Sequence, residues 1–160
     1  METGNVLIGV ISIVAIVIPF VIMYRRSKSA ERGLAKNLKE YADRNSLQLD
    51  QWESVGNLAL GLDTKNKVAY FTEIEEGVYD TRHLTLSDFS VCKVNREVRE
   101  VNYHGEKDIV THSLEVNFYP KNKKDEVASF LLFTEDKNRM LCGEIQLAND
   151  WVAKFNEVIK

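Results

Sequence analysis

The hydrophobic pattern of the chain begins with an uncharged apolar run over residues 6–24, interrupted only by Ser12. A helix over these nineteen residues rises about 1.5 Å per residue and is about 28 Å long. This length is close to the ~30 Å hydrocarbon core of a bilayer. The run therefore predicts a transmembrane helix at residues 6–24, with a short outer terminus at residues 1–5.

Two alternatives fit this run less well. A cleaved signal peptide needs a basic segment before the run and small residues at its end. The side-chain charge before the run is Glu2, and its last residues include Pro19, Phe20 and Tyr24. A buried core helix would show a polar face, which this run lacks. We therefore expect a retained membrane span.

Basic residues follow the run on its C-terminal side. They are Arg25, Arg26, Lys28, Arg32, Lys36 and Lys39. The positive flank of a span normally stays in the cytoplasm, so we expect the N-terminus outside and the C-terminal domain cytoplasmic, in the cell membrane or another bilayer. The same six residues are candidates for weak contact with anionic lipid headgroups, or they only set the topology.

Next comes a helical stripe with a period of 3.6 residues. Its apolar positions are Ala30, Leu34, Leu38, Tyr41 and Ala42. The stripe predicts a basic, amphipathic juxtamembrane helix within residues 25–46. We favour a helix that packs on its own domain or continues the span as a stalk, over one that lies against lipid headgroups.

From Asn57 the period changes to two, which is typical of half-buried strands. Residues 58–62 and 67–72 predict a hairpin around a polar turn. Further strands are expected within residues 78–86, 89–101, 114–118 and 127–133, with a turn at 103–108. The apolar phase slips within residues 89–101, which predicts a bulge or two strands.

The chain closes with an amphipathic helix that starts near Gly143. Its apolar stripe includes Ile145, Trp151 and Phe155, which we assign to the structural core. Such a helix needs an apolar surface to cover, because its aromatic side chains would otherwise be exposed.

This order of elements resembles the pleckstrin-homology-like domains, especially bacterial members. The matching segments are LALGLDTKNKVAYF, HLTLSDFSVCKV, LEVNFY and the terminal helix with Trp151 and Phe155. The resemblance covers residues 57–160. It implies an α+β globular domain over residues 47–160, with an antiparallel β-barrel that an amphipathic C-terminal helix closes. The alternative is another α+β sheet with a helix packed across one face.

Domains of this family are mostly binding modules for lipids, peptides or proteins. Members that bind phosphoinositides use clustered Lys and Arg around the first hairpin loop. Here that loop carries Lys65 and Lys67 beside Asp63 and no Arg, so we expect a solvated turn.

The net charge of −3 argues against nucleic acid as a partner. Cys92 and Cys142 are too few for a disulfide framework and are expected as reduced thiols, with one disulfide as the alternative.

Residues that could carry catalysis are few. Weak alternatives are a divalent metal held by His104, Asp108 and His112, and a nucleophilic Cys92 beside a histidine. No phosphate-binding glycine loop or zinc-protease motif occurs. We therefore expect no catalytic residue, no metal site and no cofactor.

The sequence thus predicts a single-pass, membrane-anchored cytoplasmic binding or scaffold module that contacts the bilayer through residues 6–24 and an unknown protein partner. It is not expected to be an enzyme. The alternative is an accessory structural subunit of a larger membrane protein complex.

Overall fold

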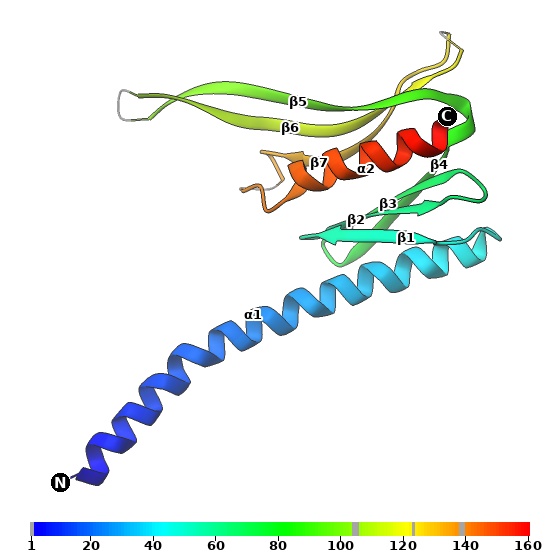
Figure 1. Ribbon diagram of the computed structural model, residues 1–160. Helices are drawn as coiled ribbons and strands as arrows, with labels where there is room; N and C mark the ends of the chain where they lie inside the picture. Colours follow the sequence, from blue (N-terminus) through cyan, green and yellow to red (C-terminus); the bar gives the residue numbers. More distant parts are fainter. Residues whose placement is uncertain (1, 104–105, 123, 138–139) are drawn as a thin grey trace.

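The computed structural model describes residues 2–103, 106–122, 124–137 and 140–160. The side chains of residues 2–14, 23–27, 103 and 106 lie outside this description. Figure 1 shows a long N-terminal helix, two stacked sheets and a C-terminal helix between them.

Two antiparallel sheets form the body of the protein. The first contains β1 (Gln51–Val55), β2 (Leu58–Asp63), β3 (Val68–Glu75) and β4 (Val78–Thr85) in that order. A short 3-10 helix, η1 (Leu86–Asp88), leads to the second sheet. That sheet contains β5 (Phe89–Tyr103), β6 (Glu106–Pro120) and β7 (Ala128–Thr134), also in chain order. Within each sheet, strands that follow one another in sequence therefore pair with each other.

Two helices cover these sheets on different sides. α1 (Glu2–Arg44) crosses the outer face of the first sheet with its C-terminal part and extends beyond it, whereas α2 (Glu144–Ile159) lies between the sheets (Figure 1). α1 is one continuous helix through the segments expected as span and juxtamembrane helix.

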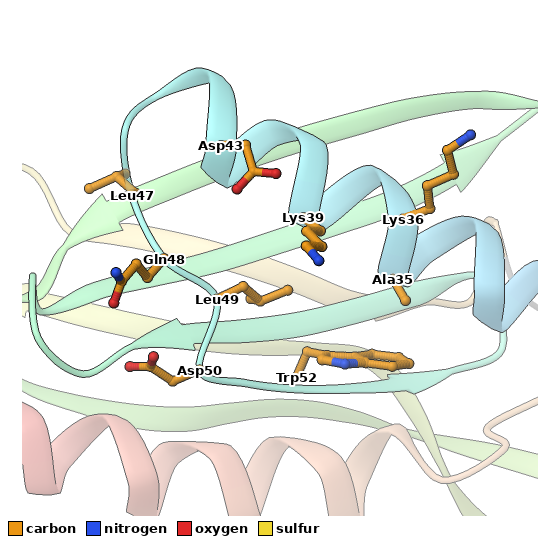
Figure 2. A pocket seen from close by; sticks show the side chains of 9 residues that line it. All are labelled: Ala35, Lys36, Lys39, Asp43, Leu47, Gln48, Leu49, Asp50 and Trp52. Carbon is orange, nitrogen blue, oxygen red and sulfur yellow. The ribbon is translucent and has the colours of Figure 1, made fainter.

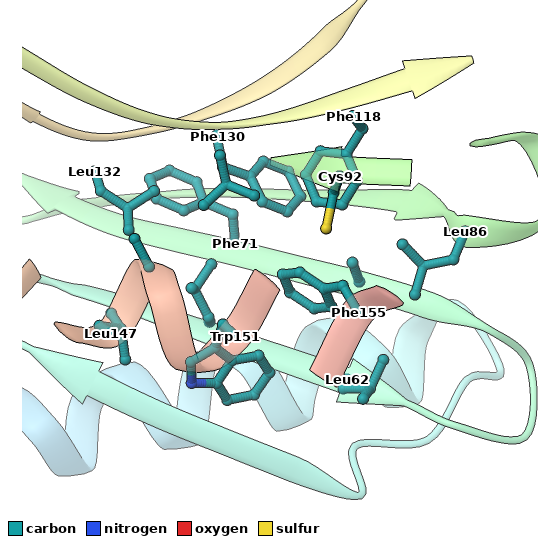
Figure 3. Packing of buried hydrophobic residues seen from close by; sticks show 14 of the residues in the cluster. Leu62, Phe71, Leu86, Cys92, Phe118, Phe130, Leu132, Leu147, Trp151 and Phe155 are labelled. Atoms are coloured by element: carbon teal, nitrogen blue, oxygen red, sulfur yellow. The ribbon is translucent and has the colours of Figure 1, made fainter. Parts of the chain in front are cut away.

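The main core fills the space between the two sheets and α2 (Figure 3). Trp151 and Phe155 of α2 are fully buried there, and Ile145 is partly buried against the same cluster. The Phe118 ring lies 5.0 Å from Phe130 and 5.5 Å from Phe155, measured between centroids. Aromatic contacts thus join the second sheet to α2.

A second, smaller core joins α1 to the outer face of the first sheet. Leu34, Leu38 and Ala42 are buried against Val68 and Tyr70 of β3. The helical stripe predicted from the sequence therefore packs on the protein's own domain, as favoured above.

The predicted membrane span was wrong. Across the part of the chain that the structure describes, no helix combines the length and the apolar character needed to cross a bilayer. The expected single-pass anchoring in a cell membrane, with the N-terminus outside and a cytoplasmic domain, is overturned with it. Of the run at 6–24, the side chains of residues 6–14, 23 and 24 lie outside the description.

The predicted closed barrel was also wrong. Closure requires each edge strand to find a partner, but the hydrogen-bonded order ends at β1 and β4 in one sheet and at β5 and β7 in the other. α2 separates two of these edges. Its Trp151 Nε1 donates to Glu53 of β1 at 2.9 Å, and its Asn156 Nδ2 donates to the Cys92 carbonyl of β5 at 2.9 Å.

Several element predictions are confirmed, and one strand was missed. The first hairpin, the last three strands and the C-terminal helix are present. The phase slip in residues 89–101 is a bulge, because β5 is one strand with register shifts at Phe89/Val91 and Glu97/Val98. β1 was not predicted. The expected turn at 103–108 was too long, because Tyr103 ends β5 and residues 106–108 begin β6; residues 104 and 105 lie outside the described residues.

Candidate functional site

The candidate site is an open groove of about 630 Å³ between the end of α1 and strand β1. We call it the α1–β1 groove (Figure 2). Its lining residues come from the last turns of α1, the connecting segment and β1. They are Ala35, Lys36, Lys39, Asp43, Leu47, Gln48, Leu49, Asp50 and Trp52.

The end of α1 directs the chain into this groove. Ser46 has φ 58°, in the left-handed region, and its N–H donates to the Asp43 carbonyl at 3.1 Å. The Leu47 N–H donates to the Ala42 carbonyl at 2.9 Å. These two bonds form a Schellman motif, which satisfies the last helical carbonyls and reverses the chain. The segment after the helix therefore returns along the sheet as the wall of the groove.

Two aspartates fix this wall to the turn between β2 and β3. The fully buried Asp63 accepts hydrogen bonds from the Gln48 N–H at 2.7 Å and the Asn66 N–H at 2.8 Å. Asp50 accepts from the Thr64 N–H at 2.8 Å. Burial raises the pKa of Asp63, but the hydrogen bonds from Asn66 and the backbone outweigh it, so the pKa lies below its usual value. Asp63 is therefore a carboxylate that holds the groove in shape.

Gly61 leaves space for the apolar floor of the groove. It pairs with Trp52 across the β1–β2 ladder. A Cβ at this position would lie 2.7 Å from Leu49 Cδ1 and 3.3 Å from Tyr70 Cβ. Because Gly61 has no side chain, the Leu49 side chain can pack against this point of the sheet.

The charges of the groove are divided between its two ends. Figure 2 shows Lys36 and Ala35 toward one end with Trp52, Lys39 near the middle, and Asp43 and Asp50 toward the other end. Lys36 Nζ also lies 3.7 Å from Glu40 of the same helix. Trp52 is 39% exposed, so its indole is available to a ligand. The arrangement is an apolar strip with a cationic and an anionic end.

Among the described residues that line the groove there is no histidine or cysteine, the residues weighed above for catalysis. Burial raises the pKa of the Cys92 thiol to about 12, so it stays protonated within the main core. His83 Nδ1 lies 2.9 Å from the Tyr41 hydroxyl, and His112 Nδ1 lies 3.4 Å from Glu135. These groups lie on separate elements away from the groove.

The metal site weighed above as a weak alternative is not tested by the structure. His104 lies outside the described residues, so its distance to Asp108 and His112 is not part of the structure. Within the described ranges, no group of three His, Cys, Asp or Glu side chains could hold a metal ion.

The basic residues predicted to contact lipid lie at several places. Lys36 and Lys39 line the groove, Lys28 and Arg32 are exposed on α1, and the side chains of Arg25 and Arg26 fall outside the description. A role in lipid contact stays a prediction for all six. Lys65 is exposed in the β2–β3 turn.

A second exposed feature lies on α1 beyond the sheet. Its large apolar side chains are between 46% and 69% exposed: Ile16, Val17, Ile18, Phe20, Val21 and Ile22. Large exposed apolar patches are typical of surfaces that contact another molecule.

The sequence did not reveal the groove, because β1 was missed. Apolar and polar residues do not alternate regularly in the segment QWESV, so its pattern does not indicate a strand. A signal was present in the dipeptide Gly56-Asn57, which separates Val55 from Leu58. Two residues of this kind between strands favour a tight hairpin, and Gly56 has φ 60°.

Searches of family models, of curated proteins and of solved structures found no match to this chain. Two antiparallel sheets with helices are not specific to pleckstrin-homology-like domains, so that resemblance also stays a prediction.

Proposed function

We propose that this protein is a binding module, without catalytic activity of its own, that holds an extended segment of a protein partner in the α1–β1 groove. The observation that carries the proposal is the position of Trp52, a half-exposed indole on an edge strand that borders the groove.

The backbone of β1 supports this kind of recognition. β1 pairs with β2 on one side and ends the sheet on the other, where, among the described residues, the hydrogen bond and ion pair from α2 reach the Glu53 side chain and not the β1 backbone. Alternate residues of an edge strand turn their N–H and C=O groups outward, where an added strand can bond to them. An extended peptide that pairs with β1 gains affinity from these bonds, and a pocket beside the strand adds specificity. Trp52 and Leu49 supply that pocket.

The divided charge indicates the chemistry of the segment. Lys36 and Lys39 favour an acidic residue near Trp52, and Asp43 and Asp50 favour a basic residue at the other end. We therefore expect the partner to present an apolar or aromatic residue between an acidic and a basic one. Rim charges of this kind set orientation and association rate more than affinity.

Selection of displayed random peptides on the full chain tests the proposal. Selected peptides should quench or shift tryptophan emission on binding. Trp52→Ala should weaken binding at least tenfold, because truncating an aromatic hot-spot residue costs about 2 kcal/mol or more. Tyr119→Ala is the matched control, because Tyr119 is 37% exposed but lies on β6 of the second sheet, away from the groove.

Lys39→Glu should weaken the binding of peptides that carry an acidic residue at the Trp52 end. It should leave the binding of peptides without such a residue unchanged. Peptides that bind equally to the wild type and to Trp52→Ala would place recognition elsewhere and contradict the proposal.

The exposed apolar part of α1 favours a second candidate, a structural subunit of a larger protein assembly. A structural subunit would be recovered from its source in a complex of fixed stoichiometry. That complex would persist in Trp52→Ala, whereas a groove-bound partner would be lost.

A further inference from the structure

The four sheet edges of this protein differ in how they are protected. An exposed edge invites pairing with another chain, and proteins usually guard it with short length, bulges, Lys or Pro. β1 has five residues, and β5 has two register shifts. The pairing of β7 with β6 is interrupted by a register shift between Leu114 and Glu115. β4 has none of these four protections, and its charged side chains, Asp80 and Arg82, have opposite signs.

The β5 edge is additionally occupied by α2. The Cys92 N–H donates to Asn156 Oδ1 at 2.9 Å, and Asn156 Nδ2 donates back to the Cys92 carbonyl at 2.9 Å. The asparagine amide thus takes the place of a neighbouring strand. Among the described residues, no such side-chain bond reaches the backbone of β4.

β4 is a long and regular edge. Its eight residues pair with β3 without a register shift, and they include neither Lys nor Pro. Thr81 and His83 point toward α1, where Thr81 Oγ1 donates to Asn37 at 2.6 Å. Asp80 and Arg82 point to the opposite, exposed face. Val78 on the same face is 68% exposed.

We propose that two copies of this chain pair antiparallel through β4, centred on Thr81, and join their four-stranded sheets into one. In this register Asp80 of each copy lies opposite Arg82 of the other, so both charged pairs are matched by one two-fold axis. A register centred on Asp80 would place two carboxylates together, and one centred on Arg82 would place two guanidinium groups together. The charge pattern therefore favours the Thr81 register.

In the single chain, Asp80 and Arg82 pair with each other, and this contact can be replaced by pairs between two copies. Arg82 Nε donates to Asp80 of its own strand at 2.9 Å. Both side chains are more than half exposed, so neither is held by the core. In the pair of copies, each Arg82 would face an equivalent carboxylate on the neighbouring strand.

Charge exchange tests the proposal in the full chain. Sedimentation of the wild type should show a concentration-dependent species of twice the 18.3 kDa chain mass. Asp80→Arg alone and Arg82→Asp alone should each weaken self-association about tenfold, because like charges then lie opposite one another twice. The double variant D80R/R82D restores both matches and should associate like the wild type.

A mixture of the two single variants provides the decisive comparison. The introduced arginine of one variant then meets the introduced aspartate of the other, and the retained Arg82 meets the retained Asp80. The mixture should therefore form a mixed pair about as well as the wild type forms its own. Changes confined to one strand's own ion pair would not produce this rescue.

Two outcomes would overturn the proposal. One is a wild type that stays monomeric up to ~100 µM. The other is a dimer that is equally strong in the wild type, both single variants and the double variant. The second result would also place the self-association on another surface, such as α1.

Discussion

At the scale of single residues, Asp63 shows how one carboxylate organises the α1–β1 groove. It is completely buried, yet it accepts three hydrogen bonds within 2.8 Å from Gln48 and Asn66. Charge-assisted bonds of this kind make the ionised form the stable one inside the protein. The pKa of Asp63 therefore lies below its ordinary value of 3.8 despite burial, which acts in the other direction.

This lowered pKa predicts a pH-dependent contribution to stability. A group whose pKa is lower in the folded state stabilises that state above the unfolded pKa, and the contribution is lost as pH falls through the folded pKa. Asp63→Asn should therefore lower the free energy of unfolding by about 1–3 kcal/mol at pH 7. The difference in the free energy of unfolding between this variant and the wild type should narrow below about pH 4.

Urea melts across pH measure this gap. Asp136→Asn, at an exposed position, is the control and should change little at any pH. A gap that stays constant down to about pH 2 would show that Asp63 does not act through its charge.

At the scale of elements, the end of α1 carries a strained residue. Ser46 adopts φ 58° in the Schellman motif, at the position where glycine is the usual residue. Ser46→Gly should therefore raise the free energy of unfolding by about 1 kcal/mol, because it removes the steric cost of a Cβ in the left-handed region.

The same substitution inside the helix provides the control. Ser29 lies within α1 and is exposed. Ser29→Gly should bring no gain, because glycine weakens a helix interior. Thermal melts of both variants compare the two positions directly. Destabilisation by Ser46→Gly would mean that the serine contributes more than its backbone geometry indicates.

Periodicity predicted β6 and α2 because their apolar residues recur on one face. The β2–β3 hairpin is buried on both faces along most of its length, and the alternation of leucine with smaller residues beside a polar turn was enough to predict it. The closed barrel could not be predicted correctly in this way. Periodicity shows which face of a strand is buried but not which edges pair, and here α2 keeps β1 and β5 apart through Trp151 and Asn156.

The groove lies beyond such local patterns for a related reason. Lys39, Asp50 and Trp52 come together because a helix end and an edge strand meet, and neither segment alone carries a recognisable motif. The stripe of Leu34 and Leu38 indicated that the helix packs on something, which proved to be the first sheet. The spacing gave no information on where along the sheet it would cross.

At the scale of the whole molecule, α2 joins the two sheets. Trp151 is fully buried in the main core, and its indole N–H reaches Glu53 of the first sheet. The Lys154 ammonium lies 4.4 Å from the Trp151 ring centroid and 3.8 Å from the Glu53 carboxylate. On the other side, Phe155 contacts Phe118 of the second sheet. The two sheets are therefore expected to unfold together.

Truncation of Trp151 tests this expectation for the entire fold. Trp151→Ala should lower the free energy of unfolding by about 3–5 kcal/mol, because it removes a large buried ring and leaves a cavity between the layers. Glu157→Ala, at an exposed position of the same helix, should change it by less than about 0.5 kcal/mol. In Trp151→Ala the remaining Trp52 reports on the first sheet, while far-ultraviolet circular dichroism reports on all elements. Coincident urea transitions by the two probes would be expected if α2 links the sheets into one cooperative unit. If Trp52 emission followed a separate, more stable transition, the first sheet with α1 would fold independently of the second, and the small core of Leu34, Leu38 and Tyr70 would be sufficient to hold it.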